Sequence, residues 1–372
     1  MSRKAAALLV VVVLALALGA CGQQGPPVPT GTAAHVLSGH AGTIRVLAVT
    51  ANSKQAVSAS WDGSLKVWDL DAGKCLRTLT GHTLQINALQ LTRDGRQAVS
   101  ASDDKTLALW DLDGASPTGG KCVRSFTGHA APVAAVALTP DGRRAVSASD
   151  DGTLQVWDLA TGRSLTPLLG HTTWVSAVAV TPDGRQAVSA SDDLTLRTWN
   201  LATGQPLRLL QGHTDFITGL VLTPDGRRAL SASEDHSLML WDLSTGLCLR
   251  TLAGHKQAVR AVALTPDGTR AVSASNDKTL KVWDLSTGQC LTTLWGHDKP
   301  VTCLALTPDG HRAVSGSEDE TLRVWDLDSG KCLRELKGHT DIIRCVAVTP
   351  DGRRAVSGSD DKTVRVWDLP TQ

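Results

Sequence analysis

Short runs of alternating apolar and polar residues recur along most of the chain, and turn-forming residues separate them. Residues 254–294 give one clear example, in which an alternating run is followed by Thr265-Pro266-Asp267-Gly268, with Pro and Gly at turn positions. The pattern predicts strands at 259–264, 270–275, 279–284 and 290–294, with a hairpin tip at 276–278. Such a four-stranded antiparallel sheet has two faces, and both must be covered.

This four-strand unit is repeated eight times. The dipeptide Gly-His begins at residues 39, 81, 128, 170, 212, 254, 296 and 338. A Trp lies 29 positions after the Gly in every copy, and the copies begin 42 residues apart, except for one step of 47. Stacking covers the faces of repeated sheets, and closing the stack into a ring gives a β-propeller. We therefore expect an all-β chain, with an eight-bladed propeller of four-stranded antiparallel blades over residues 34–369.

The two ends of the repeat array predict how the ring closes. The chain stops four residues after Asp368, so the eighth copy has no fourth strand. Residues 34–37 precede the first Gly-His, at the place where other copies have their fourth strand. We expect this N-terminal strand to complete the eighth blade and close the ring. Residues 114–121 contain the five-residue insertion behind the longer step, and they are expected to form a loop on the face opposite the Gly-His loops.

The repeat resembles the WD-repeat family over residues 34–369. In that family each blade carries a hydrogen-bonded tetrad of His, Ser, Asp and Trp, in which the hydroxyl accepts from the indole N–H and the imidazole joins Ser to Asp. By this resemblance the tetrads are His40, Ser58, Asp62, Trp68; His82, Ser100, Asp104, Trp110; His129, Ser147, Asp151, Trp157; His171, Ser189, Asp193, Trp199; His213, Ser231, Asp235, Trp241; His255, Ser273, Asp277, Trp283; His297, Ser315, Asp319, Trp325; and His339, Ser357, Asp361, Trp367. They are interpreted as structural.

The motifs argue against catalysis. A catalytic triad would be a single departure from the repeat, whereas the His-Ser-Asp set recurs at one position in all eight copies. His35, His236 and His311 lie in unrelated places, and neither a phosphate-binding loop nor an unusual channel-lining residue is recognised. Each Asp-Asp pair contains one tetrad Asp, which leaves a single free carboxylate. We expect no enzyme activity, no cofactor and no metal; the alternative is a hydrolase or redox propeller with a site in the central channel.

The N-terminal residues predict export and lipid anchoring. A short basic start precedes an uninterrupted apolar run at 5–18, which is shorter than the roughly 20 residues of a transmembrane helix and fits a signal peptide. The next residues, Leu18-Gly19-Ala20-Cys21, resemble the lipobox of bacterial lipoproteins, whose Cys is lipidated. This resemblance implies a signal peptide at 1–20, lipidation of Cys21 and, with Gly22 in place of Asp, transport to the outer membrane where the cell has one. Residues 21–33 are predicted to be a flexible tether.

The cysteines keep open the alternative that the protein is an intracellular scaffold. Cys75, Cys122, Cys248, Cys290 and Cys332 share one repeat position, at the start of the outer strand, and Cys303 and Cys345 share another. We expect these residues to be buried, and too far apart on neighbouring blades for disulfides. Seven thiols besides Cys21 are unusual in an oxidising compartment and argue against export.

Function is expected where the copies differ. In the WD-repeat family the usual partner surface carries the Gly-His loops and the hairpins between second and third strands, and we call it the Gly-His face. Its exposed variable positions are three and five residues after the tetrad His, and the residue before the tetrad Asp. Exposed Trp and Arg are enriched at binding hot spots. The predicted protein-binding residues are Trp61, Trp174, Phe216, Arg45, Arg260, Ile342 and Arg344.

Charge narrows the class of partner. With 37 Lys+Arg, 36 Asp+Glu and no basic stripe, the chain is not suited to binding nucleic acid. The residue before the tetrad Asp is acidic in most copies, as Asp103, Asp150, Asp192, Glu234, Glu318 and Asp360, and we interpret this set as a solvated rim. The chain is predicted to be a monomeric, lipid-anchored scaffold for protein–protein interaction in the cell envelope. A role in assembling envelope proteins follows only by analogy with other lipid-anchored propellers.

Overall fold

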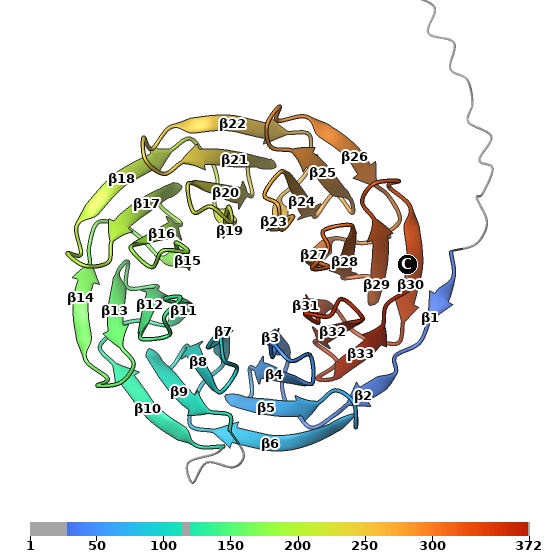
Figure 1. Ribbon diagram of the computed structural model, residues 1–372, viewed down its shortest axis with the longest axis horizontal. Helices are drawn as coiled ribbons and strands as arrows, with labels where there is room; N and C mark the ends of the chain where they lie inside the picture. The colour runs from blue at the N-terminus through green and yellow to red at the C-terminus, as the bar shows by residue number, and fades with distance from the viewer. Residues whose placement is uncertain (1–27, 114–119, 371–372) are drawn as a thin grey trace, which may run out of the picture.

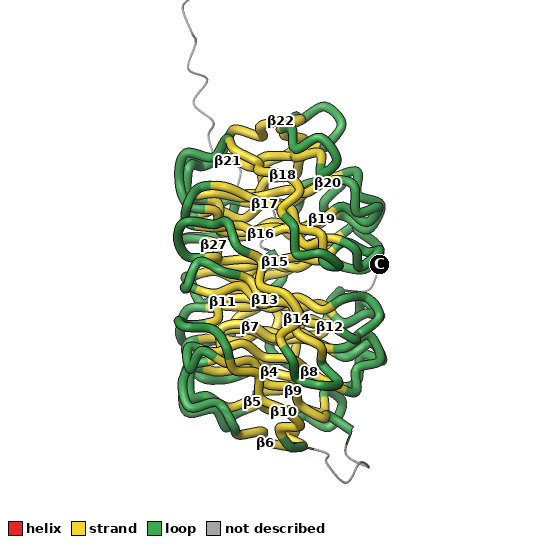
Figure 2. Tube along the Cα trace, turned by 90° about the vertical axis from the view of Figure 1, so that its left-hand side faces the viewer, coloured by secondary structure: helices red, strands yellow, loops and turns green. Residues whose placement is uncertain are grey.

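The computed structural model describes residues 28–113 and 120–370. They form eight sheets arranged radially around a central channel (Figure 1). Seen from the side, strands fill the middle of the ring and loops cover its two faces (Figure 2). The predicted all-β, eight-bladed propeller of four-stranded antiparallel blades is therefore confirmed. None of the described residues belongs to a helix long and apolar enough to cross a bilayer.

Each blade runs from an inner strand at the channel to an outer strand at the rim (Figure 1). Blade 1 contains β3 (Ile44–Val49), β4 (Gln55–Ser60), β5 (Ser64–Asp69) and β6 (Lys74–Thr80). Blade 2 contains β7 (Ile86–Leu91), β8 (Gln97–Ser102), β9 (Thr106–Asp111) and β10 (Cys122–Thr127). Blade 3 contains β11 (Val133–Leu138), β12 (Arg144–Ser149), β13 (Leu154–Asp158) and β14 (Ser164–Leu168). Blade 4 contains β15 (Val175–Val180), β16 (Gln186–Ser191), β17 (Thr195–Asn200) and β18 (Pro206–Gln211).

The second half of the ring repeats this order. Blade 5 contains β19 (Ile217–Leu222), β20 (Arg228–Ser233), β21 (Ser237–Asp242) and β22 (Cys248–Ala253). Blade 6 contains β23 (Val259–Leu264), β24 (Arg270–Ser275), β25 (Leu280–Asp284) and β26 (Cys290–Leu294). Blade 7 contains β27 (Val301–Leu306), β28 (Arg312–Ser317), β29 (Thr321–Asp326) and β30 (Cys332–Lys337). Blade 8 contains β31 (Ile343–Val348), β32 (Arg354–Ser359) and β33 (Val364–Asp368), with β2 (His35–Leu37) as its outer strand.

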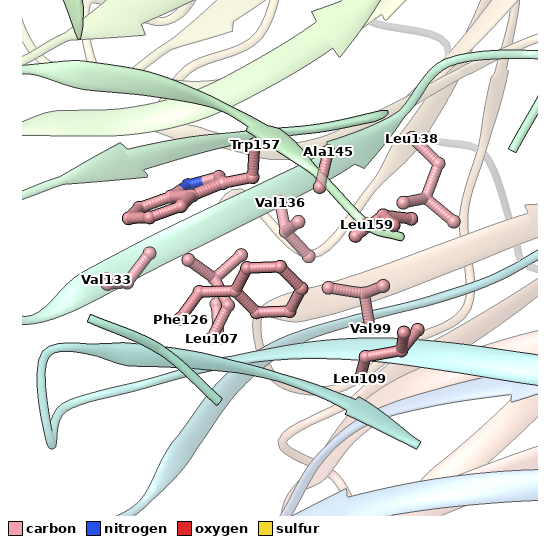
Figure 3. Close-up of a cluster of buried hydrophobic side chains, with 11 residues drawn as sticks. Val99, Leu107, Leu109, Phe126, Val133, Val136, Leu138, Ala145, Trp157 and Leu159 are labelled. Carbon is pink, nitrogen blue, oxygen red and sulfur yellow. The ribbon is translucent and has the colours of Figure 1, made fainter. Parts of the chain in front are cut away.

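The hydrophobic core lies between the blades. Figure 3 shows one such layer, in which Leu107 and Phe126 of blade 2 meet Val133 and Trp157 of blade 3. The rings of Phe126 and Trp157 pack edge to face, with centroids 5.7 Å apart. Burying a side chain such as Phe126 contributes about 1.5–3 kcal/mol. Because each layer joins neighbouring blades, a sheet that is unstable alone is stabilised within the ring.

The ring closes in blade 8, as the ends of the repeat array predict. Strand β2 pairs antiparallel with β33, with His35 opposite Val366 and Leu37 opposite Val364. The side chain of Leu37 is 2% exposed and packs in the layer between blades 8 and 1, with Ile44 and Trp68. The N-terminal strand thus satisfies the backbone edge of β33 and also fills the core at the closure.

One part of the predicted tether is not flexible chain. Thr30–Gly31 form a short strand, β1, that adds in parallel to the outer edge of β30, with Gly31 opposite Leu336. The Glu335 amide donates to the Pro29 carbonyl at 3.0 Å. A Cβ at Gly31 would lie 2.9 Å from Leu336 Cδ2, so a larger residue here would force the Leu336 side chain to shift. The prediction of a flexible tether over 21–33 is therefore wrong at residues 30–31, where an unpaired strand edge orders the chain.

The prediction of buried cysteines is also wrong in part. Cys75, Cys122, Cys248 and Cys290 are exposed, because the outer strand has no further sheet outside it, while Cys332 and Cys345 are half-buried. Cys303 is buried, and burial raises the pKa of its thiol to about 12. All seven are free thiols, so no disulfide joins neighbouring blades among the described residues.

The interior of blade 4 contains a polar group without a partner, and it leads to a prediction. Thr198 is fully buried on β17, at a position where other blades have Val or Leu, and its Oγ1 makes no hydrogen bond. An unsatisfied buried hydroxyl costs about 1–3 kcal/mol. Thr198→Val is therefore expected to raise the free energy of unfolding by about this amount, measured by urea denaturation. Val156→Thr, at the same position of blade 3, should lower it; a less stable Thr198→Val variant would contradict the assignment.

Candidate functional site

All eight tetrads are hydrogen-bonded in the same way. The indole Nε1 of each Trp donates to the Ser Oγ at 2.7–2.8 Å. The same Oγ bonds the His Nε2 at 2.7–2.8 Å. The His Nδ1 bonds the Asp Oδ2 at 2.6–3.0 Å. Each tetrad therefore links the Gly-His loop to three other parts of its blade.

The tetrad carboxylates are fully engaged and build the loops of this face. Asp62 accepts from His40, from the Ala41 amide at 2.8 Å, and from the Ser64 amide and hydroxyl at 2.9 and 2.6 Å. The imidazole rings are 0–1% exposed, so no substrate reaches them. This geometry supports a structural role for the tetrads. It leaves none of the His, Ser and Asp side chains of a tetrad free for catalysis.

Burial and hydrogen bonding fix the charges of the tetrads. Burial lowers the pKa of His40, His82, His129, His171, His213 and His339, despite the neighbouring carboxylates. Burial alone would raise the pKa of Asp62, but hydrogen bonds from Ser64, Ala41 and His40 outweigh it and hold that pKa well below its usual range. A neutral imidazole can donate to Asp through Nδ1 while Nε2 accepts from the Ser hydroxyl, which satisfies every group.

One main-chain hydrogen bond in every blade joins two of the three sets of variable positions of the Gly-His face. The residue before the tetrad Asp donates to the carbonyl three residues after the His, as in Trp61 to Thr43, Asp192 to Trp174 and Glu234 to Phe216, at 2.8–2.9 Å. The predicted binding residues Trp61, Trp174 and Phe216 are 44%, 57% and 46% exposed. Their large apolar surfaces therefore project from this face into solvent.

The predicted arginines differ in what they contact. Arg45 on blade 1 is exposed. Arg260 Nη1 pairs with Glu234 Oε1 at 2.9 Å, and its Nε bonds Asn276 Oδ1 at 3.0 Å. Arg344 makes a bidentate pair with Asp360, with Nη2 at 2.6 Å from Oδ2, and Ile342 beside it is half-buried. Two of the three predicted arginines are thus already neutralised within the face.

One large exposed apolar residue of this face is missing from the predicted set. Leu84, two residues after His82, is 54% exposed. The same position in the other copies holds Gly, Ala or a polar residue, as Gly42, Ala131, Thr173, Asp215, Gln257, Lys299 and Asp341. A comparison of the repeats at this position would have found it.

The central channel contains a residue unlike its counterparts, contrary to the prediction. A cavity of about 480 Å³ lies against the inner strands of blades 2 to 5, with Leu89, Val136, Val178 and Val221 among the lining residues. Gln90 also lines it and stands where the other blades have Ala or Val. Its Oε1 accepts from the Leu138 amide at 2.7 Å. Gln90 therefore satisfies the unpaired edge of an inner strand. Within residues 28–113 and 120–370, no group of His, Cys, Asp or Glu could hold a metal ion.

Comparisons with known proteins agree with this architecture. The family model described as "WD domain, G-beta repeat" matches residues 31–69, 73–111, 120–158, 162–200, 204–242, 246–284, 288–326 and 330–368. Among solved structures, the computationally designed Ika8 protein is similar, with 34% identity and a TM-score of 0.80 over 91% of this chain and 100% of that chain. No curated protein matches the chain. With one family match for each blade, the chain belongs to the WD-repeat family of β-propellers.

Proposed function

We propose that this propeller is a non-enzymatic scaffold that binds partner proteins at its Gly-His face and is anchored in the cell envelope by a lipid on Cys21. WD-repeat propellers commonly serve as protein-interaction scaffolds. The exposed Trp61, Trp174 and Phe216 carry the assignment of the face, because they project from positions where the repeats diverge. Trp is among the residues most enriched at the binding hot spots of protein interfaces.

The place where the tether begins is compatible with binding at this face. Cys21 lies outside the described residues, and the described chain starts at Val28, next to β1 on the rim of blade 7 (Figure 1). The seven residues from Cys21 to Val28 span at most about 25 Å. This start of the described chain at the rim supports the proposal, since Thr30–Gly31 pair with the outer strand β30 and not with a Gly-His loop.

Crosslinking in cells tests the binding face. The Trp61→Ala, Trp174→Ala and Phe216→Ala triple variant is expected to lose most of the partner proteins recovered with the wild-type chain, because hot-spot aromatics are removed. All three side chains are exposed, so the thermal unfolding midpoint should stay unchanged. Leu247→Ala is the control, since Leu247 is 64% exposed but lies in the loop between β21 and β22, on the face opposite the Gly-His loops. Undiminished recovery with the triple variant would show that partners bind elsewhere.

Metabolic labelling with a palmitate analogue tests the anchor. The wild-type chain is expected to take up the label, and Cys21→Ala is expected to take up none. The exposed thiols Cys75, Cys122, Cys248 and Cys290 favour the alternative of an intracellular scaffold, because free exposed thiols are unusual in oxidising compartments. A wild-type chain without label would support that alternative and reject the lipid anchor.

A further inference from the structure

Most of the large exposed apolar side chains on the Gly-His face lie on blades 2 to 5, in addition to Trp61 on blade 1. Leu84 lies on blade 2, Trp174 on blade 4 and Phe216 on blade 5, and each is about half-exposed. On blades 6 to 8 the positions equivalent to Trp174 hold Ala258, Pro300 and the half-buried Ile342. The face is therefore asymmetric although its scaffold is nearly repeated, and its large exposed apolar side chains lie within blades 1 to 5, most of them on blades 2 to 5.

The same blades carry carboxylates that no cation balances. The side chains of Asp150 and Asp192 have neither an ion pair nor a hydrogen bond to any described residue, and both are half-buried. On blades 6 and 8 the position five residues after the tetrad His holds Arg260 and Arg344, which pair with Glu234 and Asp360. On blades 3 and 4 this position holds Ala134 and Ser176, so the neutralising side chain is missing.

Neighbouring carboxylates add to the negative potential of these blades. Burial raises the pKa of Asp150, and the charges of Asp103 and Asp192 raise it further. Burial raises the pKa of Asp192, and Glu234 adds to this effect. Asp103 is held by the side-chain amides of Gln85 and Asn87, which satisfy its oxygens without a formal positive charge. The carboxylates therefore repel one another, and a bound cation would relieve the repulsion.

We infer that the aromatic–acidic arc, formed by Asp103, Asp150 and Asp192 with Leu84, Trp174 and Phe216, binds a Lys- or Arg-rich segment of a partner protein. An ammonium or guanidinium group pairs strongly with carboxylates and also lies favourably over the face of Trp or Phe. The apolar stems of these side chains can cover Leu84 and the aromatic rings. This inference rests on the proposed function, because it states the chemistry of the partner that the Gly-His face would bind.

Other occupants fit the arc less well. A purely apolar partner would cover Asp150 and Asp192 without supplying a partner for their charges, which costs free energy. An acidic partner would be repelled. A metal ion is not favoured, because the arc has no group of three close carboxylate, His or Cys side chains among the described residues. Charge complementarity therefore selects a basic segment.

The test is a selection of short random peptides displayed on phage, with the purified full-length protein in detergent as bait. The bound peptides are expected to be enriched in Lys and Arg and depleted in Asp and Glu. Synthetic copies should bind the Asp150→Asn, Asp192→Asn double variant and the Trp174→Ala variant at least about tenfold more weakly than the wild-type protein. Their affinity for the wild-type protein should fall as the salt concentration rises.

Two controls separate this arc from the rest of the propeller. Glu318→Gln removes an acid at the same repeat position of blade 7, and Trp295→Ala removes an exposed Trp beside the outer strand of blade 6. Both should leave peptide affinity unchanged. All the substituted side chains are exposed or half-buried, so urea denaturation should show intact folding in every variant.

Each other outcome overturns the inference. An empty selection, peptides without basic enrichment, or full affinity of the double variant would reject a basic partner. Displacement of the peptides by Ca²⁺ or Mg²⁺ alone, measured by calorimetry, would identify a cation site. The proposed function fails by a different observation, namely undiminished crosslinking of the triple aromatic variant. If the triple variant loses its crosslinked partners but the selected peptides are not basic, the binding face is supported and only the basic class of partner is rejected.

Discussion

Removing residues 28–37 is expected to lower the free energy of unfolding by at least about 3–5 kcal/mol, because the deletion removes Leu37 from a closed layer. In the full chain Leu37 is 2% exposed and packs with Ile44, Trp68 and Val364. The deletion also leaves the edge of β33 unpaired, next to an open apolar layer. An unpaired edge of this kind pairs with other chains. Urea denaturation measures the loss of stability, and light scattering should detect oligomers.

Point variants in β2 distinguish the closure from a general effect of truncation. Leu37→Ala should cost about 2–5 kcal/mol, because it leaves a cavity in the layer between blades 8 and 1. Val36, the preceding residue, is 49% exposed, so Val36→Ala should change stability by less than about 0.5 kcal/mol. A chain that begins at residue 34 lacks β1 but keeps β2, so it should stay monomeric. Equal stability of the Leu37→Ala and Val36→Ala variants would contradict closure by β2.

Acidification is expected to lower the free energy of unfolding over two successive pH ranges. Burial lowers the pKa of His40, His82, His129, His171, His213 and His339 below their ordinary value of 6.5. Unfolding therefore takes up protons at these residues, and stability falls once the pH drops below about 6.5. Each such His contributes a slope of up to about 1.4 kcal/mol per pH unit.

The second pH range belongs to the tetrad carboxylates. Burial opposes their ionisation, but hydrogen bonds prevail and hold the pKa of all eight below the ordinary value of 3.8. Stability from these groups is complete above that value and is lost as the pH falls below it. Urea midpoints measured from pH 7.5 to pH 3 should therefore fall below about 6.5 and fall more steeply below about 4. A His171→Gln variant should show a smaller slope in the first pH range, and a constant midpoint from pH 7.5 to pH 5 would refute the assignment.

The repeated part of the fold could be predicted almost residue by residue. In blade 6 the expected strands 259–264, 270–275 and 290–294 are those of the structure. The third strand begins at Leu280 rather than at 279, because the fourth strand β26 ends at Leu294, which is the partner of Leu280. Copies at a fixed spacing make such a prediction reliable, since each copy repeats the evidence of the others.

Features that depend on the assembled ring could not be predicted in this way. The parallel pairing of Thr30–Gly31 depends on the free edge of β30, which no local pattern of residues 21–33 encodes. A comparison of the repeats would have identified Gln90 as unusual, but its hydrogen bond to the Leu138 amide depends on how neighbouring inner strands lie in the ring. Ion pairing of the arginines is a further example. In the sequence Arg260 and Arg344 look available to a partner protein, whereas in the structure they pair with Glu234 and Asp360.

The closure by β2 also determines when, during synthesis of the chain, the ring can form. His35 is among the first described residues to be made, and its partner Val366 is among the last. While the chain is synthesised, β2 has no strand to pair with, and the layer between blades 8 and 1 stays open. Contacts this distant in sequence form slowly, and an unpaired edge exposed meanwhile favours aggregation. The ring therefore cannot be completed until nearly the whole chain is present, and the exposed edge of β2 favours aggregation until then.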